Sequence, residues 1–491
     1  MGWRSPVMGA AAAALLAVGM ATTACSPAQR ASQTAAGAAA NTGPLPFQLP
    51  AQSVLRASGH KVFAHYFTPY PVSLDNKDAA SDYYTRNYLS PTGESGKHAA
   101  YGGLLRDRPI GRAPISGNWQ LEDMKTEIRR AAAAGLDGFT VDLLSVGSSS
   151  PNWARVKLLI QAAEQVDPGF KIVLMPDMNG LANVDAATLA AAVASVAKSP
   201  AVYRLADKRL VVSPFKAEGK TAAWWSSWMT TMRDKYGIEI ALVPCFLNFG
   251  SNASAFAPIS YGFSNWGNRN PAANTGLAAN ITKAHQLGKK WMQPVSVQDE
   301  RPNQGKYDEA GNTENLRVTW NAAINGADWV QIPTWNDYSE GAQLSPSAKH
   351  GWTYLDLSSY YLTRLKTGKY PTITKDVVYV THRVQPAAAK PTFAETKLMT
   401  LRSGSTPARD QVEVLTMLTA AATVTATIGG TAHTYSAPAG LHVQTFPLKA
   451  GTNSVSVTRN GAVTAKVASP FTVTAKPQVQ DEQYYGVTSG R

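Results

Sequence analysis

Cysteine is nearly absent from this chain of 491 residues, which has only Cys25 and Cys245. If Cys25 carries a lipid, as argued below, no disulfide is possible. Cys245 lies in the apolar run IALVPCFLNF, without a basic neighbour in sequence that would lower the pKa of its thiol. We therefore expect a buried structural thiol there and not a nucleophile.

Charge is also sparse, since charged residues make up 16% of the chain and hydrophobic residues 44%. These values exclude a disordered or fibrous chain and predict a globular protein with a buried core. The net charge is +13, but the lysines and arginines are scattered singly, without a basic run or an aromatic-basic motif. We therefore predict no nucleic-acid partner, and attraction to an anionic cell surface is a sufficient explanation of the charge.

Motifs of several common enzyme classes are missing. There is no Gly-x-Ser-x-Gly elbow for a serine nucleophile, and neither GxGxxG nor GxxxxGK[ST] follows the first apolar runs. The eight histidines are isolated, whereas a metal centre needs clustered His or Cys ligands or an oxygen-rich loop. The sequence therefore implies no metal and no organic cofactor.

The first residues resemble a secretory signal. In MGWRSPVMGAAAALLAVGMATTAC one arginine precedes an apolar stretch that is too short and too Ala-rich for a permanent membrane helix. The segment TTAC resembles the lipobox of bacterial lipoproteins, so we expect residues 1–25 to be a signal peptide and Cys25 to be lipidated, with plain secretion as the alternative. Residues 26–55 are predicted to be a flexible linker. The protein is then expected outside the cell, anchored to the outer face of the membrane.

Residues 56–372 are predicted to form a (β/α)₈ barrel of the TIM type. Eight apolar runs alternate with segments of helical period, and several of these segments end in glycine where the next run begins. Near-continuous apolar strands separated by helices indicate a parallel sheet buried on both faces. A doubly wound open sheet is the alternative, although the phosphate-binding motif that usually supports it is missing. The predicted strands are 61–67, 137–144, 170–177, 209–215, 238–246, 259–266, 289–297 and 327–335, and the predicted helices are 120–136, 154–166, 187–198, 222–236, 278–288 and 315–325.

From residue 373 the pattern changes to short alternating runs, such as QVEVLTML, ATVTATIG and NSVSVTRN, separated by Gly, Pro, Ser and Asn. This pattern is typical of an antiparallel β-sandwich, which we predict over residues 373–476 as an accessory domain. No row of aromatic residues marks a glycan platform in its strands, so a structural role is favoured over glycan binding. The polar tail, residues 477–491, is expected to be frayed, and the whole chain is expected to be a monomer.

Candidate site residues follow from the barrel, because the chemistry of such a fold lies at the C-terminal ends of its strands and in the loops that follow. There the predicted strands present carboxylates, amides and aromatic rings. Some have structural alternatives: His65 as a hydrogen-bonded core residue, Asp177 as a loop cap, and residues 299–300 as a solvated loop. The candidates before the last strand are His65, Tyr66, Asp142, Asp177, Asn265, Trp266, Asp299 and Glu300.

The last strand runs into TWNDYSEG, residues 334–341. Asp337 and Glu340 lie three residues apart at a strand end, so both can face one site from a rigid support. Trp335, Asn336 and Tyr338 are then substrate-binding candidates. Carboxylates with aromatic rings suit cleavage of a glycosidic bond, in which one carboxylic acid protonates the leaving oxygen and a carboxylate activates water or attacks carbon. The alternative is a helix N-terminus, with Asp337 as N-cap and Glu340 as its capping-box partner.

Three segments together, VFAHYF, AAAAGLDGFTVDLL and VQIPTWNDYSEG, resemble glycoside hydrolase family 71, the endo-α-1,3-glucanases or mutanases. The resemblance implies an inverting enzyme that relies on Asp337, Glu340 and an Asp of the second-strand segment. Position for position this third residue is Asp137, at the start of the strand. Geometry favours Asp142, at the C-terminal end of the strand, so both are catalytic candidates.

We therefore predict a glycoside hydrolase that cleaves internal α-1,3-glucosidic bonds of an α-glucan with inversion. One of Asp337 and Glu340 is expected to be the general acid, with a raised pKa, and the other, or Asp142, the general base. Two alternatives stay open. One is a barrel hydrolase acting on another polysaccharide, such as a mannan or a cell-envelope glycan, and the other is a non-catalytic surface protein that binds carbohydrate.

Overall fold

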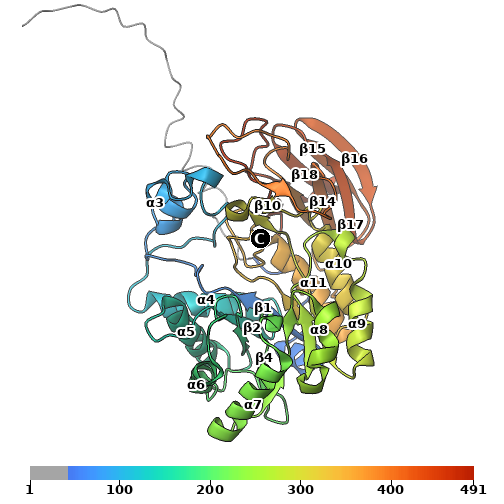
Figure 1. The fold of residues 1–491 in the computed structure, drawn as a ribbon. Coiled ribbons are helices and arrows are strands. Elements are labelled where there is room, and N and C mark those ends of the chain that lie inside the picture. The colour runs from blue at the N-terminus through green and yellow to red at the C-terminus, as the bar shows by residue number, and fades with distance from the viewer. Residues whose placement is uncertain (1–42) are drawn as a thin grey trace, which may run out of the picture.

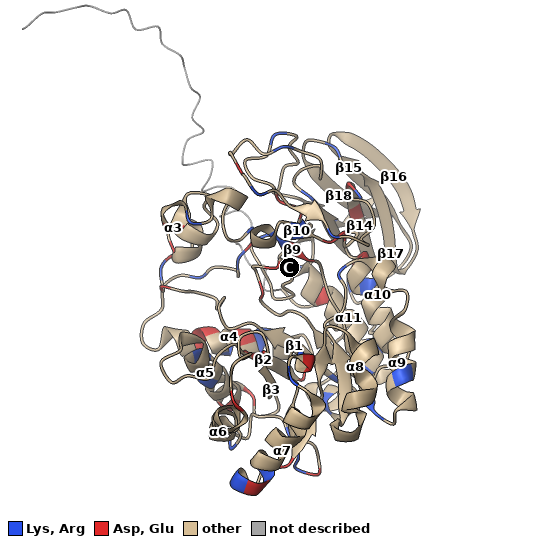
Figure 2. Cartoon of the chain, viewed as in Figure 1, with Lys and Arg blue, Asp and Glu red and all other residues tan. Residues whose placement is uncertain are grey.

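The computed structural model describes residues 43–491. The predicted signal peptide, Cys25 and the linker up to residue 42 lie outside the described residues. Within 43–491, no helix combines the length and the apolar character needed to cross a membrane. Figure 1 shows helices gathered around a group of strands, with the orange to red strands of the C-terminal residues stacked beside them. In Figure 2 the basic and acidic residues are scattered through the described chain, with uncharged residues between them.

The eight predicted strand segments all form strands of one parallel sheet. Their bounds are β1 Lys61–Tyr66, β2 Gly138–Leu143, β3 Lys171–Pro176, β4 Leu210–Val212, β5 Ile240–Leu242, β6 Cys245–Phe246, β7 Gly262–Asn265, β8 Lys290–Pro294 and β11 Trp329–Ile332. Their order in the sheet is β5-β4-β3-β2-β1-β11-β8-β7-β6. β5 and β6 come from one segment of the chain, yet β5 pairs with β4 and β6 pairs with β7. The two ends of the order therefore meet, and the sheet curves into a barrel.

Helices cover the outside of this barrel, and several of them begin at a polar cap. Their bounds are α4 Trp119–Ala133, α5 Pro151–Val166, α6 Ala186–Val196, α7 Ala222–Tyr236, α8 Phe249–Phe256, α9 Leu277–Gln286, α10 Glu314–Ile324 and α11 Thr353–Thr367, with the short α3, Gly93–Gly96, in the loop between β1 and α4. The side chains of Asn118, Ser150, Asp185 and Thr221 each accept a backbone N–H of the first turn of α4, α5, α6 and α7, respectively. The six predicted helices are confirmed.

The helix α11 was not predicted, although it is one of the longest in the described chain. Its sequence, TYLDLSSYYLTRLKT, shows no clear apolar stripe, and almost all of its residues are buried. A helix covered on all sides has no solvent-facing row of polar residues to give the helical period. The missing period therefore reflects the position of α11 between other elements.

Inside the barrel, side chains alternate between the interior and the helix layer. Phe63, Val173 and Trp329 belong to an apolar cluster formed by residues of the barrel strands. His65 lies two residues after Phe63, and Asp177 lies four residues after Val173. Both therefore lie on the interior side, above this cluster, at the C-terminal end of the barrel.

The C-terminal residues form two four-stranded antiparallel sheets, ordered β17-β14-β12-β20 and β16-β15-β18-β19. A shared cluster that includes Val378, Val414, Val424 and Val455 lies between them, so the sheets pack face to face as the alternating pattern predicted. The bounds are β12 Val377–His382, β14 Gln411–Leu418, β15 Ala422–Ile428, β16 Thr431–Ala437, β17 Gly440–Pro447, β18 Asn453–Arg459, β19 Ala462–Ala468 and β20 Tyr485–Thr488.

The prediction of a frayed C-terminal tail is wrong. β20 pairs with β12, and Gln480–Tyr485 are all buried. The Arg383 guanidinium donates to the backbone oxygen of Glu482 at 2.9 Å and to the Glu309 carboxylate at 2.9 Å. These partners lie far apart in sequence, so the polar composition of the tail gave no sign of its burial.

A small sheet joins a barrel loop to the C-terminal part of the chain. It contains β9 Glu300–Arg301, β10 Lys306–Tyr307 and β13 Thr400–Leu401. β10 pairs with β9 in antiparallel and with β13 in parallel orientation. The loop that follows β8 is therefore fixed by backbone hydrogen bonds to residues almost a hundred positions further along the chain.

The prediction of a flexible linker up to residue 55 is wrong for its last residues. Phe47 forms a β-bridge with Ile373 and packs edge to face on Tyr360, with ring centroids 5.5 Å apart. The chain then forms the helix α2, Gln52–Ala57, in which Leu55 is buried. These two apolar side chains attach the segment to the outside of the barrel.

Candidate active site

The candidate residues of the first strands meet at the C-terminal end of the barrel. His65 Nε2 lies 3.6 Å from Asp142 Oδ2, and His65 Nδ1 lies 3.1 Å from the sulfur of Met175. The half-buried Trp266 ring lies edge to face on His65, with centroids 5.1 Å apart. Burial lowers the pKa of His65 to about 4, although Asp337 acts in the opposite direction. His65 is therefore neutral at neutral pH.

Asp142 lies among other carboxylates. Burial raises its pKa well above the usual range, and the charges of Asp177 and Asp337 raise it further. Its Oδ1 atom is buried and has no hydrogen-bond partner within residues 43–491. Asp177 Oδ1 accepts the Asn179 N–H at 2.7 Å, so it caps its loop while its charge also acts on Asp142. Carboxyl groups with such raised pKa values suit proton transfer at neutral pH.

The segment TWNDYSEG forms a turn after β11. Asp337 Oδ1 accepts the Ser339 N–H at 3.0 Å, the Ser339 hydroxyl at 2.7 Å and the Glu340 N–H at 3.2 Å. No helix begins there, because the next helix in the described chain is α11, which starts at Thr353. The helix N-terminus alternative is therefore wrong, although the local bonds that it predicts are present.

Asp337 and Glu340 interact with each other. Burial raises the pKa of Glu340 to about 8, and the charge of Asp337 adds to this rise, whereas Arg301 opposes it. Arg301 Nη1 lies 2.7 Å from Glu340 Oε1. Burial also raises the pKa of Asp337, against the hydrogen bonds from Ser339 and the charge of Arg301. A pKa of about 8 means that the Glu340 carboxyl group is protonated at neutral pH.

Two arginines of the site were not predicted from the sequence. Arg301 donates from Nε and Nη2 to Asp299, at 2.9 and 2.6 Å. Burial alone would raise the pKa of Asp299, but Arg301, Arg269 and Arg402 lower it below its usual value. Arg269 is buried, and its guanidinium lies over the Trp266 ring, 5.4 Å from the centroid. The sequence signal for Arg301 was its place beside two candidate acids in SVQDERPN, whereas Arg269 had none.

Tyr66 and Trp335 do not face the site, contrary to the prediction. Tyr66 points to the helix layer, where its hydroxyl donates to the sulfur of Met124 at 3.2 Å. Trp335 is fully buried against Phe139, with centroids 5.0 Å apart, and its indole N–H donates to Glu127. Both are core residues between the barrel and α4, so neither can stack on a sugar ring.

Asn336 and Tyr338 also have structural positions rather than the predicted substrate contacts. Asn336 Nδ2 donates to the backbone oxygens of Phe67 and Tyr70, both at 2.9 Å, and Asn336 Oδ1 accepts the Phe67 N–H at 2.7 Å. Tyr338 is buried, and its hydroxyl lies 2.9 Å from Ser345 Oγ. These two residues fix the loop after β1 against the TWNDYSEG turn.

Asp137 lies at the opposite, N-terminal end of β2. Its Oδ2 atom accepts the Val62 N–H at 2.7 Å and forms an ion pair with Lys366 Nζ at 2.5 Å. The structure therefore separates Asp137 from the other catalytic candidates. Of the two aspartates of this segment, only Asp142 lies with Asp337.

Glu300 and Asn265 lie near the site in different ways. The Glu300 side chain turns to the C-terminal tail, where its Oε1 atom accepts the Glu482 N–H at 3.2 Å, and only its backbone N–H reaches the TWNDYSEG turn, at Glu340 O. Asn265 is half-buried at the end of β7, beside Trp266, and its Oδ1 atom has no partner in the described part of the chain. The solvated-loop alternative is wrong for Asp299 and Glu300, because both are buried.

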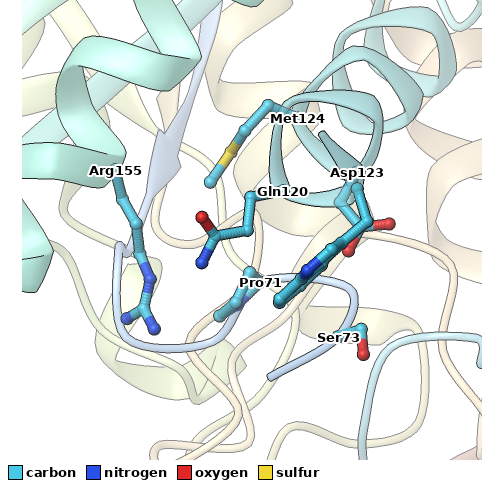
Figure 3. Close-up of a pocket in the computed structure, with 7 residues that line it drawn as sticks. Pro71, Ser73, Gln120, Asp123, Met124 and Arg155 are labelled. Carbon is cyan, nitrogen blue, oxygen red and sulfur yellow. The ribbon is translucent and has the colours of Figure 1, made fainter. Parts of the chain in front are cut away.

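The cavity in Figure 3 is separate from these residues. It lies beside α4, where Met124 and Gln120 face Pro71 and Arg155, and its volume is about 10 Å³. That is room for about one water molecule. None of the predicted site residues lines it, so it carries no part of the candidate chemistry.

A barrel that gathers interacting carboxyl groups beside an aromatic ring at the C-terminal ends of its strands has the equipment of a glycoside hydrolase. The chain matches the model of glycosyl hydrolase family 71 over residues 113–486, and it belongs to that family. It is 26% identical over 405 residues to a glucan endo-1,3-alpha-glucosidase of Schizosaccharomyces pombe, covering 76% of this chain and 93% of the relative.

Two further similarities were found. A mutanase of Penicillium rubens is 26% identical over 374 residues, which cover 71% of this chain and 80% of the relative. Among solved structures, the GH99 endo-alpha-mannosidase from Bacteroides thetaiotaomicron aligns with a TM-score of 0.49 and 15% identity, covering 62% of this chain and 97% of that one. The protein is thus a glycoside hydrolase.

Proposed function

We propose that this enzyme hydrolyses internal α-1,3-glucosidic bonds of an α-glucan with inversion at the anomeric carbon. The names of the two relatives support the substrate, since one is a glucan endo-1,3-alpha-glucosidase and the other a mutanase. The observation that carries the proposal is the pair of Asp337 and Glu340, in which burial and the neighbouring carboxylate raise the pKa of Glu340 to about 8.

In this mechanism Glu340 is the general acid. Its carboxyl group is protonated at neutral pH and gives its proton to the glycosidic oxygen as the bond to the anomeric carbon breaks. Asp337, with Asp142 as the alternative, accepts a proton from the water that attacks this carbon from the opposite face. Trp266 offers a half-buried aromatic ring beside His65 for contact with a sugar. In the alternative, the charge of Asp177 makes Asp142 a stronger proton acceptor, because it raises the pKa of Asp142.

The barrel that holds these groups is, we infer, a closed (β/α)₈ barrel. Eight strand segments supply its wall, and the fifth segment pairs with β4 through β5 and with β7 through β6. Each of the eight segments is followed by one of the helices α4 to α11. The same arrangement would place the chemistry at the C-terminal ends of the strands.

The enzyme is proposed to work as a monomer outside the cell, held on the outer face of the membrane by a lipid on Cys25. The signal-like segment before Cys25 and the resemblance of TTAC to a lipobox support this location. Labelling of the full chain with radioactive palmitate, compared with a Cys25→Ser variant, tests it. Label that remains on the variant would contradict a lipid at Cys25.

The test of function is release of reducing sugar from insoluble α-1,3-glucan by residues 43–491. This fragment keeps Phe47 and α2, which pack on the barrel. Asp337→Asn and Glu340→Gln are the active-site variants, and starch and a mannan are the control polymers. We expect release from the α-1,3-glucan that both variants lose, and the first product, observed by proton NMR, should have the β configuration.

Other results would contradict parts of the proposed function. Release from the mannan alone would show that the substrate of the relatives does not carry over to this chain. An α-configured first product would contradict inversion. Binding of the polymer without any release would favour a carbohydrate-binding protein over an enzyme with this specificity.

A further inference from the structure

The C-terminal part of the chain reaches the active site through the small sheet β9-β10-β13. Arg301 in β9 is paired with Lys306 in β10, and Lys306 is paired with Thr400 in β13. The next residues continue this contact, because the Arg402 N–H donates to Tyr307 O at 2.8 Å. Arg301 and Arg402 therefore project from one hydrogen-bonded sheet.

A chain of ion pairs connects Arg402 to the proposed general acid. Arg402 Nη2 donates to Asp299 Oδ1 at 3.1 Å, and Arg402 Nε donates to Asp308 Oδ2 at 2.9 Å. Asp299 in turn accepts two nitrogens of Arg301, whose third nitrogen, Nη1, lies 2.7 Å from Glu340 Oε1. Each acidic group in this series of ion pairs thus has an arginine beside it, and each arginine joins two acidic groups.

The geometry of Arg301 depends on Asp299. A guanidinium group is planar and rigid, so two hydrogen bonds from Nε and Nη2 to one carboxylate also fix the direction of Nη1. The Asp299 side chain is 1% exposed and the Arg301 side chain 17%. Arg402, at 39% exposure, is the outer member. Its Nη2 atom donates to Asp299 Oδ1, which also accepts from Arg301 Nε, so the two arginines share the negative charge.

Without Arg402, the buried Asp299 and Asp308 would lose the cation that they share, and Asp299 would face Arg301 with its charge less compensated. Asp299 and Asp308 lie next to each other, since the Asp308 N–H donates to Asp299 O at 3.0 Å. The charge of Asp299 already raises the pKa of Glu340, against Arg301 and Arg269. Loss of Arg402 should therefore draw Arg301 toward the aspartates and away from Glu340.

We propose that Arg402, a residue of the C-terminal part of the chain, is a positioning residue for hydrolysis: through Asp299 it fixes the Arg301 guanidinium beside the Glu340 carboxyl group. This inference rests on the proposed role of Glu340 as the general acid. It makes the C-terminal part of the chain a component of the active site rather than only a support for the barrel.

The experiment compares Arg402→Ala with the unchanged protein and with Arg459→Ala, all as residues 43–491. Arg459 is a matched control, because it also forms an ion pair, with Asp376 at 2.7 Å, but in the sandwich. We expect Arg402→Ala to lower kcat on α-1,3-glucan roughly tenfold with little change in KM, since a displaced catalytic group slows the chemical step. Added guanidinium ion, below denaturing concentrations, should restore part of the loss.

The pH profile separates positioning from general damage. Glu340 faces Asp337, Asp299, Arg269 and Arg301, and losing Arg402 leaves Asp299 less compensated. The alkaline limb of the kcat profile of Arg402→Ala should therefore move to higher pH, while the limb of Arg459→Ala should not move. An unchanged profile in a folded Arg402→Ala, or an equal shift in Arg459→Ala, would overturn the inference.

A crystal structure of Arg402→Ala gives a result that needs no activity. We expect Arg301 Nη1 to move out of hydrogen-bond distance of Glu340 Oε1. If the two atoms stay as they are, the inference fails even when the enzyme is active on the glucan. If the unchanged protein releases no sugar, the proposed function fails, and the position of Arg301 in the variant still decides whether Arg402 holds it.

Discussion

Asp137 and Asp142 lie at opposite ends of the barrel, and their carboxyl groups have opposite surroundings. At the N-terminal end, Asp137 is paired with Lys366, and Asp328 accepts from Lys290 and from the Trp291 N–H. At the C-terminal end, burial and then the charges of Asp177 and Asp337 raise the pKa of Asp142. Of Asp137 and Asp142, the one with a cation beside it holds the fold together, whereas the one among acids is ready to exchange a proton.

The largest effect is expected at the C-terminal end. Asp337→Asn should lower kcat about 10³-fold, because it removes the proposed general base while leaving a side chain of the same size. The thermal midpoint should change little, since the amide oxygen can still accept the N–H groups of Ser339 and Glu340. Reducing-sugar release and a melting curve measure the two quantities. Activity within a few-fold of the unchanged protein would remove Asp337 from the mechanism.

Two aspartates of one strand allow the sharpest comparison. Asp142→Asn should reduce kcat about 10²-fold with equal or higher stability, because the amide that replaces this buried carboxyl group never carries a charge. Asp137→Asn should destabilise the fold by about 3 to 5 kcal/mol, because it leaves Lys366 buried without its partner. The folded fraction of this variant should keep its kcat.

Urea unfolding and single-substrate kinetics on both variants test this contrast. The reverse result, with stability lost in Asp142→Asn and activity lost in Asp137→Asn, would exchange the roles assigned to the two ends. It would also favour the position-for-position correspondence with the family over strand geometry.

Replacing Glu340 should change how the stability of the protein depends on pH. Its folded pKa, about 8, lies above the value of an unfolded glutamate, about 4.3. The stabilising contribution of the protonated form is therefore fully present below about pH 4.3 and is lost as the pH rises to 8. Glu340→Gln should lose less unfolding free energy between pH 5 and 8 than the unchanged protein, as measured by urea titration at each pH. Parallel curves would contradict the raised pKa.

The smallest effect is expected from Lys290→Met at the N-terminal end. The Lys290 side chain is 51% exposed, and Asp328 keeps His285 at 2.8 Å and the Trp291 N–H at 2.9 Å. An exposed ion pair of this kind contributes about 0 to 1 kcal/mol, so the unfolding free energy should change by less than about 1 kcal/mol. The kcat should be unchanged. A marked loss of kcat would show that the N-terminal end of the barrel is coupled to the active site.

The sequence predicted the strands of the barrel and the acids of the site because both have local signals. Apolar runs between caps marked the strands, and the position of a residue at a strand end marked His65, Asp142 and Asp337. Cys245 is buried, as its apolar setting predicted, and within residues 43–491 it has no disulfide partner. The aromatic residues of TWNDYSEG were misjudged, because their composition does not show which face of the turn Trp335 occupies.

What the sequence did not show depends on contacts between distant residues. Arg301 and Arg269 acquire their roles only when separate loops meet beside Glu340. The tail seemed frayed because its polar residues find buried partners such as Arg383, almost a hundred positions earlier in the chain. The helix α11 was missed because it is covered on all sides.

The buried tail has a consequence for how the enzyme is made. Protein chains are synthesised from the N-terminus, and parts that emerge first can fold first. All strands of the barrel precede residue 333, but the backbone N–H that binds the Glu300 carboxylate belongs to Glu482. A chain whose C-terminal residues have not yet docked can thus contain a nearly complete barrel and still lack the contact between the tail and Glu300. Catalytic competence should therefore appear as a late event of biosynthesis, after the tail has emerged and docked.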